Sequence, residues 1–281
     1  MTGTLYSFGH GYSAQELSRL LAPAGWRIIG TTRDPAQSPT LRASGAEPVV
    51  WPGQQVDLDG VTHLLISTAP NAEGDPVLAA LKDEITGRAA QFEWVGYLST
   101  TAVYGDHQGD WVDETTPATP TAQRGRWRVQ AEQQWLTIPG LPTHIFRLAG
   151  IYGPGRGPFS KLKRVGMRRI IKPGQVFSRI HVADIAQVLA ASMAAPNPGA
   201  IYNVCDDEPV PPQDVIAYAA ELQGLPLPPA VPFAKADLAP MARSFYNENK
   251  RVRNDRIKDE LGVKLLYPDY RVGLTSLMRA E

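Results

Sequence analysis

Short apolar runs alternate with helical stretches along most of this chain, and no other feature of the sequence constrains the fold as strongly. Runs this short, dense in aliphatic and aromatic residues, are typical of strands buried on both faces of a parallel sheet. Regular alternation of strand and helix predicts an α/β fold, a doubly wound parallel sheet of the Rossmann type. The runs lie at residues 4–8, 27–32, 48–51, 63–68, 92–99, 143–148 and 200–204.

Helix signals fill the stretches between the runs. Asp75 places an N-cap residue before Pro76, because proline is favoured at the first helical position. Further helices are expected at residues 13–22, 126–136 and 183–194.

Composition excludes several classes of protein. The 281 residues carry 28 Lys and Arg against 28 Asp and Glu, so the basic excess typical of nucleic-acid-binding proteins is missing. Cys205 is the only cysteine, which rules out an internal disulfide or a cysteine-rich zinc site. The histidines lack ligand spacing, so no metal site is expected. With no signal peptide and no apolar run of about 18 residues, we expect a cytoplasmic protein without nucleic-acid or membrane partners.

The segment SFGHGYSA follows the first apolar run and opens a helix, and it reads G-x-G-x-x-A with Gly9, Gly11 and Ala14. The first glycine allows a tight turn, and the second lets the backbone approach a pyrophosphate. Ala14 permits close packing of helix and sheet, and the amides around Tyr12 and Ser13 would bind phosphates at the helix N-terminus. This turn predicts a dinucleotide-binding site.

The end of the second run bears on the choice between NAD and NADP. An NAD site places an acid about 20 residues after the glycines, whereas this chain has Thr32 and Arg33 there. A hydroxyl and a guanidinium suit a 2′-phosphate. We therefore favour NADP, and Asp34, the next residue, leaves NAD possible. Thr68 and Ala69, at the end of the fourth run, would lie beside a ribose of the dinucleotide.

After residue 150 the alternation loosens. Residues 168–182 are expected to hold two short strands around a Pro-Gly turn. We expect an NAD(P)-binding Rossmann domain over residues 1–150. A smaller substrate-binding lobe would follow over residues 151–281, interleaved with the last strand of the sheet.

Four later segments carry a resemblance to a known family. They resemble the motifs of the extended and atypical short-chain dehydrogenase/reductases, the NAD-dependent epimerase/dehydratase family. With the glycine-rich turn, the resemblance spans nearly the whole chain in the right order, and it implies an NAD(P)-dependent enzyme that is often a homodimer. The segments are LSTTAVYG (98–105), RLAGIYGPG (147–155), RIHVADIA (179–186) and IYNVCDDEPV (201–210).

The resemblance implies a catalytic Ser or Thr and a Tyr-x-x-x-Lys pair on the following helix. Thr100, four residues before Tyr104, falls on the Ser/Thr position, where a capping threonine is the alternative interpretation. Glu132 sets the register of the helix. In this register Arg124 stands at the tyrosine position and Arg128 at the lysine position.

This exchange removes the family's usual proton donor. The family's tyrosine is a general acid and base, activated by the positive charge of the lysine. Arginine keeps its proton, because its pKa exceeds about 12. Arg128 could hold the nicotinamide ribose and Arg124 an oxyanion or a substrate anion, or both could be ordinary exposed residues. Tyr104 and Tyr152 are the nearest candidates for a replacement proton donor.

The expected substrate is a small molecule. Gly150 stands where sugar-nucleotide members of the family usually carry asparagine, which argues against a nucleotide sugar. Residues 161–172 hold six basic residues and no acid. With Arg124, Arg128 and Arg156 they could attract an anionic substrate, or they could form a solvated helix face.

Two functions of different classes remain open. One is an NAD(P)-dependent oxidoreductase or epimerase/dehydratase-like enzyme with a non-standard active site. The other is a catalytically silent NADP(H)-binding sensor or scaffold, which the loss of the Tyr-x-x-x-Lys pair favours. Nucleic-acid binding through residues 161–172 is a third idea, and the zero net charge argues against it.

Overall fold

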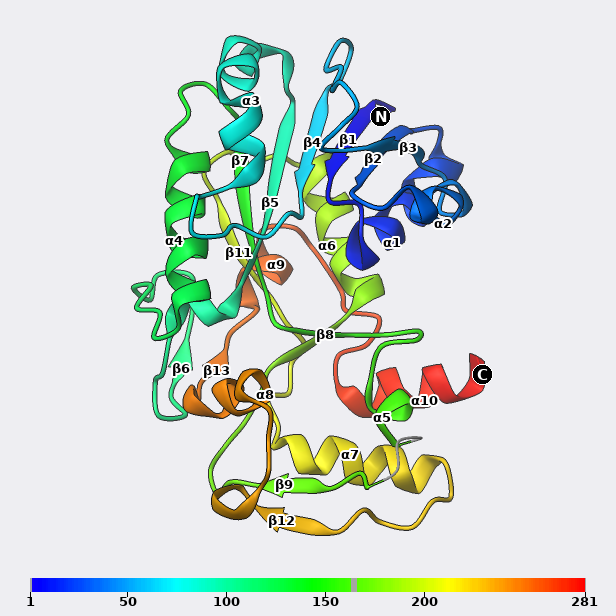
Figure 1. Cartoon of the computed structure of the whole chain (residues 1–281), viewed down its shortest axis with the longest axis vertical. Coiled ribbons are helices and arrows are strands. Elements are labelled where there is room, and N and C mark those ends of the chain that lie inside the picture. Colours follow the sequence, from blue (N-terminus) through cyan, green and yellow to red (C-terminus); the bar gives the residue numbers. More distant parts are fainter. Residues whose placement is uncertain (1, 163–165, 281) are drawn as a thin grey trace.

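All seven predicted strands lie in one parallel sheet (Figure 1). In this computed structural model, which describes residues 2–162 and 166–280, the strand order is β11-β7-β5-β4-β1-β2-β3. The predicted doubly wound Rossmann fold is confirmed. The strands are β1 Thr4–Phe8, β2 Arg27–Thr32, β3 Glu47–Val50, β4 His63–Ile66, β5 Trp94–Thr100, β7 Thr143–Leu148 and β11 Ile201–Val204.

Helices cover both faces of this sheet (Figure 1). Helices α1 (Tyr12–Leu21) and α6 (Val182–Ala194) share one apolar core with the sheet, and α3 (Pro76–Gly87) and α4 (Gln123–Leu136) share the other. Leu5 of β1 belongs to the first core and its neighbour Tyr6 to the second. Both faces of the strand are therefore buried, which is why aliphatic and aromatic residues dominate its sequence.

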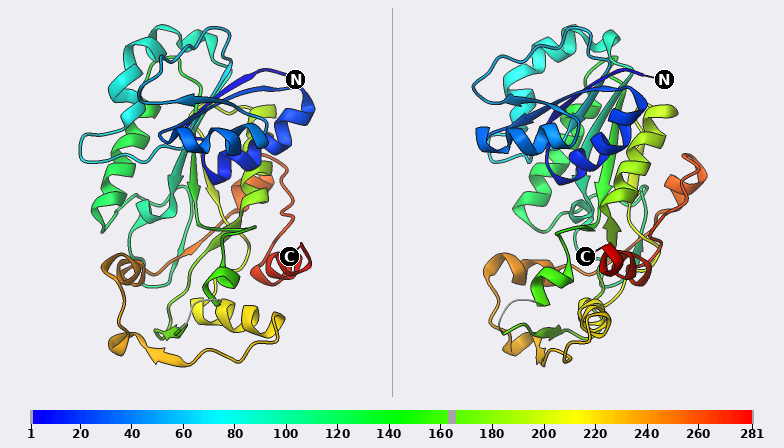
Figure 2. Two further views of the ribbon diagram at one scale, coloured as in Figure 1. Left: turned by 45° about the vertical axis from the view of Figure 1, so that its right-hand side comes forward. Right: turned by 90° about the vertical axis from the view of Figure 1, so that its right-hand side faces the viewer.

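The C-terminal half of the chain builds a smaller lobe at one end of the sheet (Figure 2). It has an apolar core of its own that joins β8, α5, α7 and α10. The chain leaves this lobe to add α6 and β11 to the Rossmann layers, and it leaves again to pack α9 (Asp255–Asp259) against β11. The remaining elements of the C-terminal half are β8 Gly150–Tyr152, α5 Pro158–Leu162, β9 Arg169–Ile171, β10 Arg179–His181, α7 Pro212–Leu222, β12 Ala230–Pro232, α8 Pro240–Ser244, β13 Arg251–Val252 and α10 Tyr270–Ala280.

The two short strands expected within residues 168–182 are present, but they do not form a hairpin. β9 pairs in parallel with β12, and β10 pairs in parallel with β8. A hairpin would need antiparallel neighbours joined by a tight turn, whereas each of these strands finds its partner in a distant segment. The last small pair joins β13 to β6 (Trp111–Val112).

A buried network of polar side chains fixes α4 to the sheet. Arg147 of β7 donates from Nη2 to Glu132 Oε2 over 2.8 Å and from Nε to Glu132 Oε1 over 3.2 Å. Ser99 of β5 donates its hydroxyl to the same carboxylate, and the Arg147 guanidinium lies 4.9 Å from the centre of the Tyr104 ring. All four residues are buried. The network therefore sets the position of α4 beside the end of β5.

Candidate functional site

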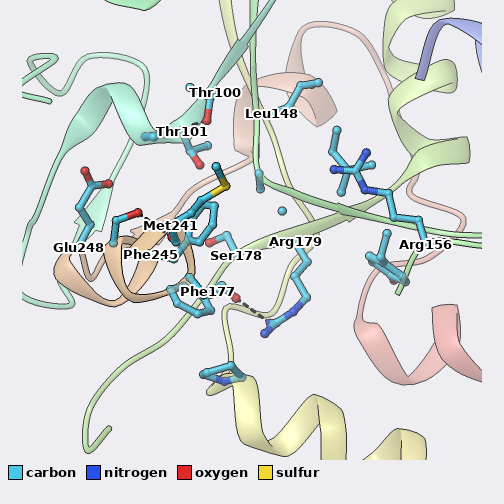
Figure 3. A pocket seen from close by; sticks show the side chains of 18 of the residues that line it. Thr100, Thr101, Leu148, Arg156, Phe177, Ser178, Arg179, Met241, Phe245 and Glu248 are labelled. Atoms are coloured by element: carbon cyan, nitrogen blue, oxygen red, sulfur yellow. Dashed lines mark hydrogen bonds between the residues drawn. The ribbon is translucent and has the colours of Figure 1, made fainter. Parts of the chain in front are cut away.

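A cleft of about 1520 Å³ opens at the carboxyl ends of the strands and continues into the C-terminal lobe (Figure 3). The part of the cleft beside the sheet is lined by residues from the loops after β1 and β4. The strand order reverses between these two strands, and open α/β sheets bind ligands at such a switch point. The location alone makes the cleft the candidate site.

The glycine-rich turn lines the cleft with all five of its predicted residues, Gly9, Gly11, Tyr12, Ser13 and Ala14. Gly9 has a φ of +72°, and a Cβ there would lie 3.1 Å from the Thr68 backbone nitrogen, so only glycine fits. Gly11 is the N-cap of α1, and no side chain caps this helix end. The first amides of α1 thus remain available to an anion, and the chain provides a cradle that fits a diphosphate.

The four residues predicted to lie beside the ribose and 2′-phosphate groups of the dinucleotide differ in whether they line the cleft. Ala69 lines the cleft, whereas the Thr68 side chain lies against Gly9 and not in the lining. Thr32 and Arg33 also lie outside the lining. The Thr32 hydroxyl accepts a hydrogen bond from the Asp34 backbone nitrogen over 3.1 Å, and Arg33 is exposed in the loop after β2.

Thr100 at the end of β5 and Arg124 in the first turn of α4 both line the cleft. The Thr100 hydroxyl accepts a hydrogen bond from the Ala102 nitrogen over 3.2 Å, so this residue caps the following turn as well as lining the cleft. Helix α4 starts three residues before the predicted 126, and its first turn approaches Ala102 closely. A Cβ on Gly125 would lie 3.1 Å from the Ala102 carbonyl oxygen. This approach places the exposed Arg124 in the cleft wall.

Arg128 also lines the cleft, but part of its guanidinium binds the ends of the strands. Its Nη1 donates to the Leu98 carbonyl oxygen over 2.6 Å and lies 3.4 Å from the Thr68 carbonyl oxygen. The same nitrogen contacts the Tyr97 hydroxyl over 3.2 Å. Arg128 thus ties the carboxyl ends of β4 and β5 together beside the site.

The two tyrosines named as replacement proton donors point away from the cleft. Tyr104 is fully buried outside the lining, and its hydroxyl donates to Asn203 Oδ1 over 2.7 Å. Burial raises the pKa of Tyr104 to about 12. Tyr152 lines the cleft, yet its hydroxyl lies 3.5 Å from the Asp269 carbonyl oxygen, and burial raises its pKa further.

The structure adds two functional groups that sequence reasoning missed. Glu248 and Lys250, from the loop before β13, line the cleft that Thr100 also lines. Lys250 Nζ donates to Glu248 Oε2 over 2.8 Å and to the Gly105 carbonyl oxygen over 2.7 Å, and Thr121 donates to Glu248 Oε1 over 2.6 Å. The side chains are only 13% and 9% exposed. No motif marks them, because they lie more than a hundred residues from Thr100 along the chain.

Basic side chains dominate the charge of the cleft. The lining includes six basic side chains and two acidic ones among the described residues. Within the basic segment 161–172, Lys163 and Arg164 lie outside the described residues, and Arg168 lines the cleft. The basic lining residues are Arg124, Arg128, Arg156, Arg168, Arg179 and Lys250, and the acidic ones are Asp237 and Glu248.

Other members of the segment have structural roles. Arg169 donates to the Pro228 carbonyl oxygen over 2.9 Å, and Lys172 donates to the carbonyl oxygen of Tyr246.

Across residues 2–162 and 166–280 no cluster of His, Cys, Asp or Glu is arranged to hold a metal ion. In the same described part of the chain, no helix is long and apolar enough to cross a membrane.

A functionally unknown conserved protein from Silicibacter pomeroyi is similar to this chain along its whole length. Its solved structure matches with a TM-score of 0.98 and 79% sequence identity, covering 99% of each chain. This chain belongs to the same family. Protein YeeZ of Escherichia coli K12 is 29% identical over 279 residues, which cover 93% of this chain and 95% of YeeZ. No protein-family model matches the sequence.

Enzymes and related proteins of lower identity share the fold. Human epimerase family protein SDR39U1 (isoform 2), solved with NADPH, has a TM-score of 0.76 at 15% identity and covers 98% of this chain and 99% of its own. The dTDP-glucose 4,6-dehydratase from Bacillus anthracis, solved with NAD, has a TM-score of 0.77 at 15% identity, with 99% and 96% covered. The chain therefore has the fold of the NAD-dependent epimerase/dehydratase proteins, as the motif resemblance predicted.

Proposed function

We propose that this chain binds a nicotinamide dinucleotide, with a preference for NADP(H), and interconverts a hydroxyl and a carbonyl group on a small anionic substrate. The observation that carries the proposal is the uncapped N-terminus of α1, which meets the glycine-rich turn at the switch point of the sheet. Proteins of the same fold were solved with NADPH or NAD. The activity is that of an oxidoreductase or of an epimerase/dehydratase-like enzyme.

Residues around the glycine-rich turn would hold the dinucleotide, which when bound supplies or accepts a hydride at its nicotinamide. The amides of Tyr12 and Ser13 face the diphosphate position. Arg156 adds positive charge there, since its guanidinium lies 5.6 Å from the centre of the Tyr12 ring. Arg128 would hold the nicotinamide ribose with the nitrogens that do not bind the strand ends.

Glu248 replaces the missing tyrosine as acid and base. Its Oε1 takes a proton from the substrate hydroxyl when the alcohol is oxidised, and returns the proton to the carbonyl oxygen in the reverse direction. Lys250 stabilises the carboxylate through the 2.8 Å ion pair. Thr100, Thr101 and Arg124 supply hydrogen-bond donors in the same cleft for the developing oxyanion.

A Glu248→Gln variant should lower kcat about 100-fold or more, because the amide cannot accept the substrate proton. NADPH affinity should stay the same. The measurement is the rate of NADPH consumption or formation with the most active compound from a library of carbonyl and hydroxy compounds. Glu208→Gln is the matched control, since Glu208 pairs with Arg271 and lies outside the cleft lining. A kcat within about twofold of wild type would reject the role of Glu248.

An Arg33→Ala variant should reduce the preference for NADPH over NADH about tenfold, through loss of a charge-assisted bond to the 2′-phosphate. The Asp34 carboxylate accepts a hydrogen bond from the Ala36 nitrogen over 3.0 Å at Oδ1, and its second oxygen remains an acceptor for a ribose hydroxyl of NADH. Calorimetric titration with both coenzymes measures the ratio. Arg42→Ala, an exposed arginine near the end of α2 (Ser38–Ala43), is the control. An unchanged ratio in Arg33→Ala would place the 2′-phosphate elsewhere.

A catalytically silent NADP(H) sensor is the second candidate function. The observation that favours it is the use of Arg128 as a tie between strand ends, at the position where the family carries its catalytic lysine. One experiment separates the two candidates. Turnover of any compound in the library supports the enzyme, whereas tight NADPH binding with no turnover supports the sensor. Absence of binding to all four nicotinamide coenzymes would overturn both.

A further inference from the structure

Arg179 is a half-buried cation in the C-terminal half of the cleft, at the start of β10 (Figure 3). β10 pairs with β8 so that Arg179 lies opposite Gly150, the residue where related sugar-nucleotide enzymes usually carry asparagine. Burial lowers the pKa of the Arg179 guanidinium, because little water surrounds its charge. The group stays charged at neutral pH, so its environment needs an explanation.

Backbone carbonyls hold one side of this guanidinium. Nη1 donates to the Phe177 carbonyl oxygen over 2.8 Å, the contact drawn in Figure 3, and lies 3.4 Å from the Val210 carbonyl oxygen. Within the described residues Nε and Nη2 make no hydrogen bond. An arginine presents these nitrogens as a fork that matches the two oxygens of a carboxylate or phosphate. The chain thus orients the group and leaves its binding edge open.

The buried acid in the neighbourhood does not neutralise this charge directly. Asp206 is 1% exposed, and neither of its carboxyl oxygens has a hydrogen-bond partner in the described chain. Burial raises the pKa of Asp206 well above its ordinary value, which favours the neutral form. Among the described residues Arg179 therefore has no direct ion-pair partner, although the nearby charge of Asp206 acts to raise the pKa of its guanidinium.

Apolar and aromatic side chains of the C-terminal lobe line the same cleft as Arg179. Such walls favour a ligand with a hydrophobic body, and a half-buried guanidinium in the same cleft favours an anionic group on that ligand. The walls include Tyr152, Pro212, Val215, Tyr270 and Leu274.

We propose that Arg179 binds the carboxylate or phosphate group of the substrate, whose apolar body packs against the walls of the C-terminal lobe. The inference rests on the proposed function, because it names the substrate class for the same cleft. The substrate would be a small amphiphilic oxyanion, such as an aliphatic or aromatic hydroxy acid or its phosphate counterpart. Arg179 would act as a specificity-determining residue rather than as a proton carrier.

Three probes of equal chain length test this inference: hexanoate, hexyl phosphate and the neutral hexanamide. Binding is measured by calorimetry on the wild-type protein, both without coenzyme and saturated with NADPH. We expect one or both anions to bind roughly tenfold or more tightly than hexanamide, as a charge-assisted bidentate contact predicts. The better anion distinguishes a carboxylate site from a phosphate site.

Variants assign the preference to one residue. Arg179→Gln should abolish the preference for the anions, while Arg253→Gln should keep it, since Arg253 is an exposed arginine outside the cleft lining. Because Arg179→Gln removes a buried group, a second measurement uses the wild-type protein. In ¹⁵N spectra of the arginine side chains, the signal that disappears in Arg179→Lys is assigned to Arg179 Nε. In the wild-type protein this signal should shift when the preferred anion is added and should not shift when hexanamide is added.

The outcomes separate this inference from the proposed function. Protein that binds NADPH but shows no anion preference, or keeps that preference in Arg179→Gln, overturns the role of Arg179 and leaves the coenzyme proposal standing. An Arg179 Nε signal that does not shift with any of the three probes also overturns the proposed role of Arg179. Anion binding through Arg179 in a protein that takes up no coenzyme would instead reject the proposed function and keep the anion site.

Discussion

Leucine in place of Gly11 should weaken NADPH binding about 100-fold or more while the protein stays folded. Gly11 has an ordinary φ of −93°, and a Cβ there meets only the Gly9 carbonyl oxygen, at 3.7 Å. The backbone therefore accepts a side chain without strain. The leucine would occupy the space in front of the α1 amides, which the diphosphate must approach. Calorimetric titration with NADPH measures the loss.

The control for this variant is Gly87→Leu. Gly87 ends α3, nothing lies within 4 Å of an added Cβ, and the residue is outside the cleft lining. Both variants should unfold near the wild-type temperature, but NADPH should raise the unfolding temperature only of wild type and Gly87→Leu. Unchanged NADPH affinity in a folded Gly11→Leu protein would contradict the dinucleotide site itself.

Replacement of Arg147 by methionine should lower the free energy of unfolding by about 3–5 kcal/mol. The Arg147 and Glu132 side chains are only 6% and 3% exposed, so removal of the guanidinium leaves a carboxylate buried without its counter-charge. The variant also loses the stacking of Arg147 on the Tyr104 ring. Urea unfolding followed by circular dichroism measures the change. The position of α4 depends on this pair, so any activity should fall as well.

Two further variants test the explanation. Arg27→Met breaks an ion pair of the same length, 2.8 Å, with Glu47, but both side chains are 57% exposed, and the cost should stay below about 1 kcal/mol. A double variant, Arg147→Met with Glu132→Leu, should recover much of the lost stability because no charge remains buried. If Arg147→Met costs no more than Arg27→Met, the buried network does not stabilise this fold.

The sequence predicted the sheet because each strand carries its own signal. Strands such as β1 and β4 are buried on both faces, so aliphatic and aromatic residues dominate these short segments, a signal that local sequence patterns carry. The glycine-rich turn was predictable for the same reason, since Gly9 and Gly11 act through the local backbone. Strand bounds differ from the predicted runs by no more than two residues.

The polar side chains of the site take their positions from contacts between segments that are distant along the chain. No local sequence pattern indicates such contacts. Glu248 and Lys250 reach the cleft because β13 pairs with β6, far away along the chain. Tyr104 and Tyr152 have the right residue type and fall in family motifs, but tertiary packing turns both hydroxyls toward other partners. Residue type and spacing could suggest proton donors, whereas only the fold decides which group faces the substrate.

The return of the chain from the lobe to the sheet limits how this architecture can vary. α6 and β11 complete the Rossmann layers, yet they are encoded in the middle of the C-terminal half. A chain cut after residue 150 would leave β7 as an open edge and uncover the apolar face of α1. The C-terminal lobe therefore cannot be exchanged as one continuous segment of chain, because part of that segment belongs to the Rossmann layers.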